Sequence, residues 1–270
     1  MLTCGIDVGS RSTKAVVIDE TGDVLGRGLI LTGGMPSESA VKALNEALLA
    51  ARVERSNVVH IAATGYGRRL VSDRDFMFTP VSCHAVGAYH AFPGTVNVLD
   101  VGAIRSVSIR LDENGHVHRF RLNDRCGSGV GRYLERVAET LEIPLEEIGQ
   151  LALFSRDPHP VPSVCSVLAE TEVLNLVTRE MKPADILKGV CDSLAERLAS
   201  QLKQIWVPGK ETTLTGGIAK NAGMVASLES ALGVALNIGH DAEFMGAIGA
   251  ALLSFNPQTE NPQETSGNKT

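Results

Sequence analysis

The feature that most constrains the fold is a pattern of strands and turns that occurs twice. Residues 2–30 read LTCGIDVGSRSTKAVVIDETGDVLGRGLI, where alternating apolar runs are separated by a glycine turn and a Thr-Gly turn. Residues 95–123, TVNVLDVGAIRSVSIRLDENGHVHRFRLN, repeat the scheme with an Asn-Gly turn. Each segment predicts a three-stranded meander with Asp-Val-Gly at its first turn. A duplicated β-meander with helices between the copies predicts two α/β lobes with a cleft between them.

Helical patterns fill much of the remaining chain and set the expected domain boundaries. In chain order we expect a helix at 37–51, a strand near 58–67, a helix at 80–92, helices after Cys126 and Cys165, a long helix at 183–205, a strand, Gly-Gly turn and helix over 211–232, and a last strand and small-residue helix over 235–255. The expected lobes are 1–95 and 96–255, and the second carries the cysteine-bearing helices. The tail, 256–270, lacks apolar periodicity and is expected to be disordered.

Composition and charge exclude several classes of function. The net charge of −6 argues against nucleic acid or an anionic membrane as partner. No run approaches the roughly 20 apolar residues of a membrane span, and the N-terminal sequence reads as a strand rather than a signal peptide. We therefore expect a cytoplasmic protein. Its five cysteines are an odd number and widely spaced, so a disulfide framework is not expected.

Asp7 and Asp100 each stand at a strand end beside a glycine turn. Because Mg²⁺ takes carboxylate, water and phosphate oxygens, we expect both residues to be catalytic and to approach one Mg²⁺ from opposite lobes. Glycine turns let backbone N–H groups approach an anion, and the TGGIAKN of 215–221 suits an adenosine and its α-phosphate. The residues expected to bind the nucleotide are Gly9, Ser10, Ser12, Lys14, Gly102, Gly216, Gly217 and Asn221.

Cys126 and Cys165 both stand directly ahead of helical patterns. A helix N-terminus carries partial positive charge, which favours a thiolate or an anionic cluster. Two thiolates do not complete the four-thiolate site of an iron–sulfur cluster, but two subunits that each give two thiolates would. The other cysteines, Cys4, Cys83 and Cys191, lie in apolar patterns and are expected to be buried.

Several motifs together resemble one family. The motifs GIDVGSRSTKAVVID, ATGYGR, CHAVGA, NDRCGSGVGRYLE, SVCSVLAETEV and TGGIAKNAG are similar to those of the ATP-dependent activators of 2-hydroxyacyl-CoA dehydratases and the ATPase subunits of benzoyl-CoA reductases. The resemblance implies the two-lobed actin, Hsp70 and sugar-kinase ATPase fold with a nucleotide cleft between the lobes. It implies that Cys126 and Cys165 bind a [4Fe–4S] cluster shared by two subunits, and that Glu170, in an Ala-Glu-Thr-Glu motif, is near the nucleotide.

The same resemblance implies the cofactors and partners. ATP or ADP with Mg²⁺ would occupy the cleft, and the dimer partner would be a paralogous ATPase subunit or a second copy. Reduced ferredoxin or flavodoxin would donate the electron, and the catalytic subunits of an acyl-CoA reductase or dehydratase would receive it.

One departure from the family bears on the choice between these systems. The dehydratase activators carry Gly, Gln and Asp where this chain has Ala103, Ile104 and Arg105, so the second turn looks more like that of benzoyl-CoA reductase subunits. We therefore favour a benzoyl-CoA reductase-type subunit over a homodimeric dehydratase activator. A small-molecule kinase and a nucleotide-binding partner subunit without turnover remain open. His84 lies among small apolar residues and is interpreted as a core histidine.

Overall fold

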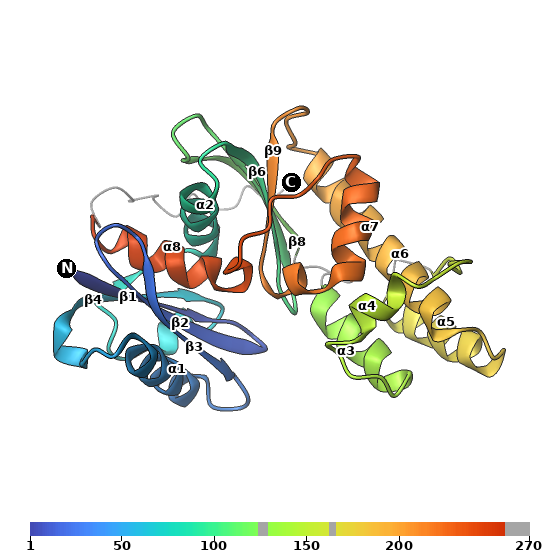
Figure 1. Cartoon of the computed structure of the whole chain (residues 1–270), viewed down its shortest axis with the longest axis horizontal. Coiled ribbons are helices and arrows are strands. Elements are labelled where there is room, and N and C mark those ends of the chain that lie inside the picture. The colour runs from blue at the N-terminus through green and yellow to red at the C-terminus, as the bar shows by residue number, and fades with distance from the viewer. Residues whose placement is uncertain (124–128, 162–165, 257–270) are drawn as a thin grey trace, which may run out of the picture.

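The computed structural model describes residues 1–123, 129–161 and 166–256, with the backbone alone for 166–170. Cys126, Cys165 and nearly all of the tail predicted to be disordered lie outside these residues. Within them, the two predicted meanders form the cores of two separate sheets (Figure 1).

The N-terminal sheet has the strand order β3-β2-β1-β4-β5. Its strands are β1 (Leu2–Val8), β2 (Ser12–Ile18), β3 (Val24–Leu31), β4 (Val58–Gly65) and β5 (Phe76–Met77). The first three are antiparallel, as the alternating pattern predicts, and β4 runs parallel to β1. Helix α1 (Pro36–Ala51) packs its small apolar residues on one face of this sheet, and α8 (Met245–Leu253) packs on the other.

The C-terminal sheet repeats this topology with the order β8-β7-β6-β9. Its strands are β6 (Thr95–Val101), β7 (Ser106–Leu111), β8 (Val117–Asn123) and β9 (Glu211–Thr215). The meander β6–β8 is antiparallel, and β9 runs parallel to β6 as β4 does to β1. Helix α2 (Pro80–Ala91) covers one face of the sheet.

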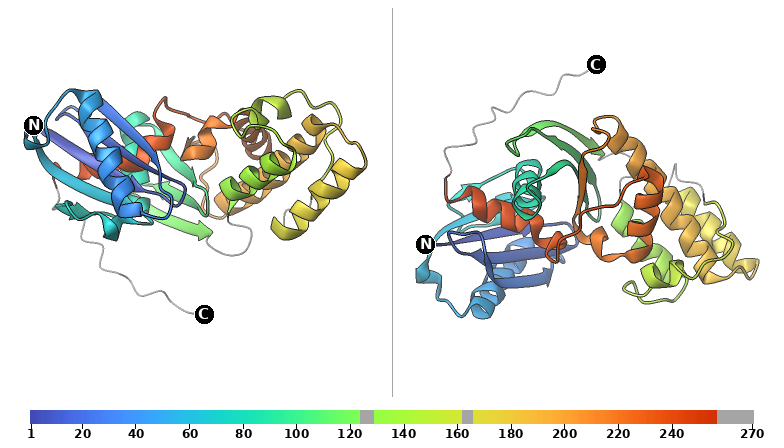
Figure 2. Two further views of the ribbon diagram at one scale, coloured as in Figure 1. Left: turned by 90° about the horizontal axis from the view of Figure 1, so that it is seen from below. Right: turned by 45° about the horizontal axis from the view of Figure 1, so that its top comes forward.

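The largest hydrophobic cluster lies on the other face of the C-terminal sheet. Its helices are α3 (Val130–Thr140), α4 (Ile148–Ala152), α5 (Ser166–Thr178), α6 (Pro183–Lys203) and α7 (Ala222–Leu232). Figure 2 shows them as a separate group at the end of the molecule away from the N-terminal sheet. Among the described residues, no helix combines the length and apolar character that crossing a bilayer requires.

Helices α2 and α8 pack together between the two sheets, and glycines allow the contact. A Cβ built on Gly249 of α8 would lie 1.8 Å from the Cys83 carbonyl oxygen of α2. A Cβ on Gly87 would lie 2.4 Å from the Met245 carbonyl oxygen. No side chain fits at either position, so the two helix backbones are in direct contact. Although α8 falls within 96–255 in sequence, it packs on β1 and β4 of the N-terminal sheet.

The prediction of a strand at the start of 235–255 is wrong. Only a single bridge forms there, between Asn237 and Thr213. The chain then turns across the end of β9, and the Ala242 carbonyl accepts the Gly216 N–H at 2.9 Å. The parallel pairing at Asn237 is not continued by its neighbours, so no ladder develops. The predicted burial of Cys4, Cys83 and Cys191 is confirmed.

Candidate functional site

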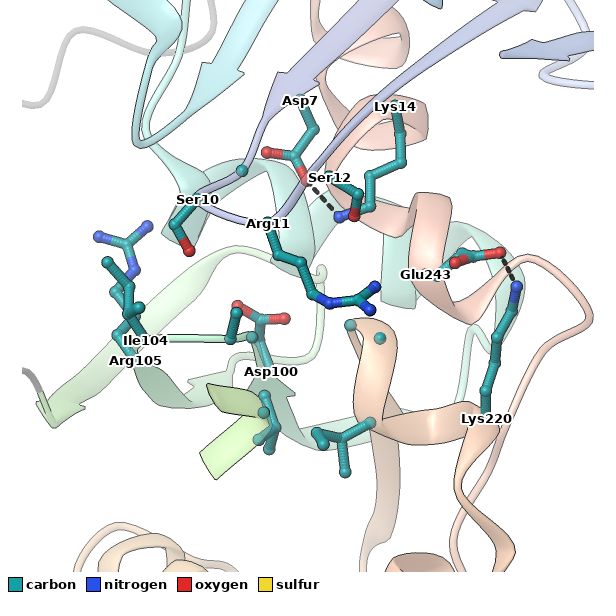
Figure 3. Close-up of a pocket in the computed structure, with 18 of the residues that line it drawn as sticks. Asp7, Ser10, Arg11, Ser12, Lys14, Asp100, Ile104, Arg105, Lys220 and Glu243 are labelled. Carbon is teal, nitrogen blue, oxygen red and sulfur yellow. Dashed lines mark ion pairs between the residues drawn. The ribbon is translucent and has the colours of Figure 1, made fainter. Parts of the chain in front are cut away.

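One cavity of about 750 Å³ is lined by the Asp-Val-Gly turns of both sheets (Figure 3). Among the described residues it collects most of the site predicted from sequence. The predicted residues that line it are Asp7, Gly9, Ser10, Ser12, Lys14, Asp100, Gly102, Gly216, Gly217 and Asn221. The side chain of Glu170, like Cys126 and Cys165, lies outside the part of the chain that the structure describes.

In the N-terminal half, Asp7 at the end of β1 is directed into the cavity. Its side chain is nearly buried, and Lys14 on the paired strand β2 places Nζ 4.0 Å from Asp7 Oδ2. Thr64 and Gly65 end the parallel strand β4 beside it. Gly65 has a φ of +89°, and a Cβ built there would lie 2.3 Å from Asp7 Oδ1. Glycine is therefore required both for the backbone conformation and for the carboxylate's position.

The C-terminal half repeats this arrangement around Asp100. Asp100 pairs in register with Thr215 of β9, whose hydroxyl donates to Asp100 Oδ1 at 3.4 Å. Gly216 follows with a φ of +88°, and a Cβ there would lie 2.7 Å from Asp100 Oδ1. The duplication thus includes a Thr-Gly pair after each parallel strand. Sequence reasoning gave Thr64 and Gly65 no role at the site and missed this pair, although the repeat was present as a signal.

The two hairpin turns share one backbone hydrogen bond but differ in side chains. The Gly9 N–H donates to the Ser12 carbonyl at 3.2 Å, and the Gly102 N–H donates to the Arg105 carbonyl at 3.0 Å. The turns are therefore equivalent residue by residue, and Arg105 stands where Ser12 stands in the first turn. The first turn carries two hydroxyls and the guanidinium of Arg11, whereas the second carries a methyl, a sec-butyl group and the guanidinium of Arg105.

His84 is a site residue that sequence reasoning assigned to the core. It is buried, as expected, but it also lines the cavity. Its Nδ1 lies 3.0 Å from Thr215 Oγ1 and 3.4 Å from Asp100 Oδ1. A Cβ built on Gly246 would lie 2.9 Å from His84 Nε2 and 3.1 Å from Asp7 Oδ2. The imidazole therefore lies between the two aspartates, held by a helix that connects the sheets.

Helix α3 contacts both hairpin turns. The Ala103 carbonyl of the second turn accepts the Arg132 N–H, in the first turn of α3, at 3.0 Å. This approach needs Gly131, where a Cβ would lie 2.8 Å from Ala103 Cα. From the first turn, Arg11 forms an ion pair with Glu135 of α3. The helix therefore contacts the hairpin turns of both sheets at once.

The opposite end of the cavity is formed by the start of α7 and the turn before it. A Cβ built on Gly217 would meet open space, so this backbone is accessible to a ligand. Asn221 lines the cavity, yet its Oδ1 accepts the Met224 N–H at 2.9 Å and caps α7. Lys220 and Glu243 form an ion pair at this end (Figure 3). Asn221 thus has a structural role in addition to its position at the site.

The donor set can be tested against Mg²⁺. Mg²⁺ commonly takes one or two protein carboxylates and completes its shell with water and phosphate oxygens. Asp7 and Asp100 open onto one cavity, and the described residues contain no group of three or more His, Cys, Asp or Glu that would hold a metal alone. The site fits an Mg²⁺ ion that a phosphate ligand shares. Asp7 and Asp100 would hold it there, and the ion would neutralise phosphate charge.

Comparison with known proteins decides the family. The model of the BadF/BadG/BcrA/BcrD ATPase family matches residues 4–254. The chain belongs to this ATPase family. It is 36% identical to the activator of lactoyl-CoA dehydratase from Anaerotignum propionicum, over 94% of this chain and 98% of the relative. It is 35% identical to one of the subunits of benzoyl-CoA reductase from Thauera aromatica, over 93% of this chain and 92% of that relative.

Solved structures agree with the family and confirm the predicted fold. The activator of the 2-hydroxyisocaproyl-CoA dehydratase from Clostridium difficile, solved with bound ADPNP, matches with a TM-score of 0.90 and 29% identity over 100% of both chains. A ROK family glucokinase from Streptomyces griseus matches with a TM-score of 0.58 and 14% identity, over 94% and 99%, which shows the fold alone. The family member has the actin- and sugar-kinase-like ATPase fold, and the resemblance found in the sequence is confirmed.

Proposed function

We propose that the chain couples MgATP hydrolysis to electron transfer from a [4Fe–4S] cluster, of which it carries half, to a benzoyl-CoA reductase-type catalytic partner. The observation that carries the proposal is the pair Asp7 and Asp100, brought to one cavity by the duplicated hairpins of an ATPase family member. In this proposal the lobes 1–95 and 96–255 bind the nucleotide between them.

The cavity's chemistry supports distinct roles along the nucleotide. Asp7 and Asp100 would share the Mg²⁺ ion, whose other ligands would be phosphate oxygens and water. Ser10, Ser12 and Lys14 would supply donors to the phosphates. The open backbone at Gly217 would lie against the adenosine end. His84 would orient the Asp100 carboxylate through their 3.4 Å contact.

The cluster would be held by Cys126 and Cys165 together with two thiolates of a partner subunit. When bound it would supply a low-potential electron, accepted from reduced ferredoxin or flavodoxin. Support for coupling comes from α3, the first helix after Cys126, because it contacts both nucleotide turns through Arg132 and Glu135. A change in the spacing of the turns would therefore be transmitted to the residues that precede this helix.

A second candidate is a homodimeric activator of a 2-hydroxyacyl-CoA dehydratase. The 36% identity to the lactoyl-CoA dehydratase activator favours it, and the 35% identity to the benzoyl-CoA reductase protein of Thauera aromatica is nearly the same. The second turn favours the reductase type, because it has Ala103, Ile104 and Arg105 where the dehydratase activators have Gly, Gln and Asp. The two candidates differ in whether the chain needs an unlike subunit.

The test is an anaerobic assay of iron and acid-labile sulfide, with EPR of the dithionite-reduced protein, on the chain alone and co-expressed with a paralogous subunit. We expect about two irons per chain, half of a shared cluster. Cys126→Ala should remove them, whereas Cys191→Ala, a buried cysteine of α6, should keep them. Iron only on co-expression favours the reductase type. No iron in either preparation, with ATP turnover intact in Cys126→Ala, would refute the electron-transfer proposal in favour of a kinase.

A further inference from the structure

Among the residues that the structure describes, four cationic side chains line the cavity, and three of them are paired. Arg11 pairs with Glu135, Lys220 pairs with Glu243, and Lys14 lies 4.0 Å from Asp7. The fourth is Arg105, which is half-buried. No ion pair or side-chain hydrogen bond joins its guanidinium to any residue that the structure describes.

A second arginine, Arg68, adds positive charge near Arg105. Arg68 is partly buried, and its Nη1 donates to the Gly65 carbonyl at 3.0 Å. Burial, followed by the nearby charges of Arg69 and Arg105, lowers the pKa of Arg68. Like charges repel one another, and an anion bound beside Arg105 relieves that repulsion. The group therefore has the electrostatic character of an anion site.

The place of Arg105 along the cavity identifies which anion fits. Figure 3 shows Lys220 and Glu243 at one end of the view, Asp7 and Asp100 in the middle, and Arg105 with Ser10 at the other end. With the adenosine against Gly217 and Mg²⁺ between the aspartates, as proposed above, the terminal phosphate of ATP would point toward the end of the cavity where Arg105 lies. ADP would lack that phosphate.

We propose that Arg105 binds the terminal phosphate of ATP and makes this site prefer ATP to ADP. This inference rests on the proposed function and names the specificity residue of the same site. A guanidinium presents several donors in a fixed plane and forms charge-assisted hydrogen bonds with phosphate oxygens. The equivalent residue of the first turn, Ser12, has a short hydroxyl side chain, so only the second turn contributes a cation at this place.

The experiment is calorimetric titration of the full chain, in the assembly in which it purifies, with Mg²⁺ and either ADP or the imido-bridged ATP analogue. Arg105→Gln should weaken the binding of the analogue by about ten- to a hundredfold, which is the range for the loss of a hydrogen bond to a charged group. Binding of ADP should change less than about twofold. Arg105→Lys should retain part of the preference, because the charge remains.

Arg119→Gln is the matched control, since it removes the same charge from an exposed residue of β8 that does not line the cavity. It should leave both affinities unchanged. The thermal midpoint of ligand-free Arg105→Gln should equal or exceed that of the wild type, because an unpaired half-buried cation does not stabilise the fold.

Three results would overturn the inference. Equal weakening of both nucleotides would mean that Arg105 acts on the part they share. No change in Arg105→Gln would make Arg105 a solvated strand-end arginine. If the thermal midpoint of ligand-free Arg105→Gln falls and the binding of both nucleotides weakens equally, the role of Arg105 is structural. Wild-type protein that binds neither nucleotide would refute the proposed function itself, which distinguishes that failure from failure of the role of Arg105.

Discussion

Replacing Gly65 with alanine should displace the carboxylate of Asp7, an effect that can be separated from the ordinary cost of alanine at a glycine position. A Cβ at Gly65 would lie 2.3 Å from Asp7 Oδ1, and ordinary van der Waals contact begins at 3.4 Å. The carboxylate or the end of β4 must therefore move by about 1.1 Å, the difference of these two distances. Displacements of about 1 Å at a reacting centre can lower turnover by about a hundredfold.

The matched control is Gly209→Ala, in the exposed loop before β9. Gly209 also has a positive φ, +74°, but a Cβ there would meet nothing within 4 Å. Both variants bear the cost of alanine at positive φ, about 1–2 kcal/mol. Only in Gly65→Ala does the new Cβ also overlap Asp7. This overlap should lower the free energy of unfolding by about a further 1–3 kcal/mol, the cost of an overpacked core.

Urea unfolding and an ATP hydrolysis assay together measure the difference. Gly65→Ala should be the less stable variant by about 1–3 kcal/mol, and its ATP turnover should fall by about a hundredfold. Gly209→Ala should keep wild-type turnover. If the two variants match in unfolding free energy and in turnover, Gly65 does not position Asp7, and the argument from the duplicated Thr-Gly pair is refuted.

Two further predictions concern residues outside the cavity. Arg27 donates two hydrogen bonds of 2.6 Å to Asp241, and these lower the pKa of the Asp241 carboxyl. The pair therefore stabilises the folded state fully above the unfolded pKa of about 3.9. This stabilisation disappears as the pH falls through the lower pKa of the folded state. Asp241→Asn should therefore unfold about 1 kcal/mol more easily than wild type at pH 7, and a difference unchanged at acid pH would contradict this reasoning. Burial raises the pKa of the Cys4 and Cys191 thiols to about 12, so iodoacetamide at pH 8 should label both in urea and neither in the native protein, as peptide mass spectrometry would show. Rapid native labelling would contradict the burial of β1 and α6.

The local patterns of the sequence predicted most of the elements correctly. Alternation and turn residues depend on neighbours in the chain, so both meanders and the positions of Asp7 and Asp100 at their turns could be predicted without tertiary contacts. The strand expected before α8 failed for the converse reason. Apolar residues alone do not show how far a segment pairs with a sheet edge, and here the pairing with β9 is a single parallel bridge at Asn237.

The site itself required the tertiary structure. His84 reads as a core residue because its helix neighbours are small and apolar, and only the packing of α2 between the sheets brings its Nδ1 to Thr215 and Asp100. Gly246 lies far along the chain from Asp7, yet α8 returns to the N-terminal sheet and sets it beside that carboxylate. The sequence by itself determined which side chains stand at each turn, because that depends on local backbone geometry. The tertiary structure decided which of them share one cavity, because proximity between distant segments depends on how helices and sheets pack.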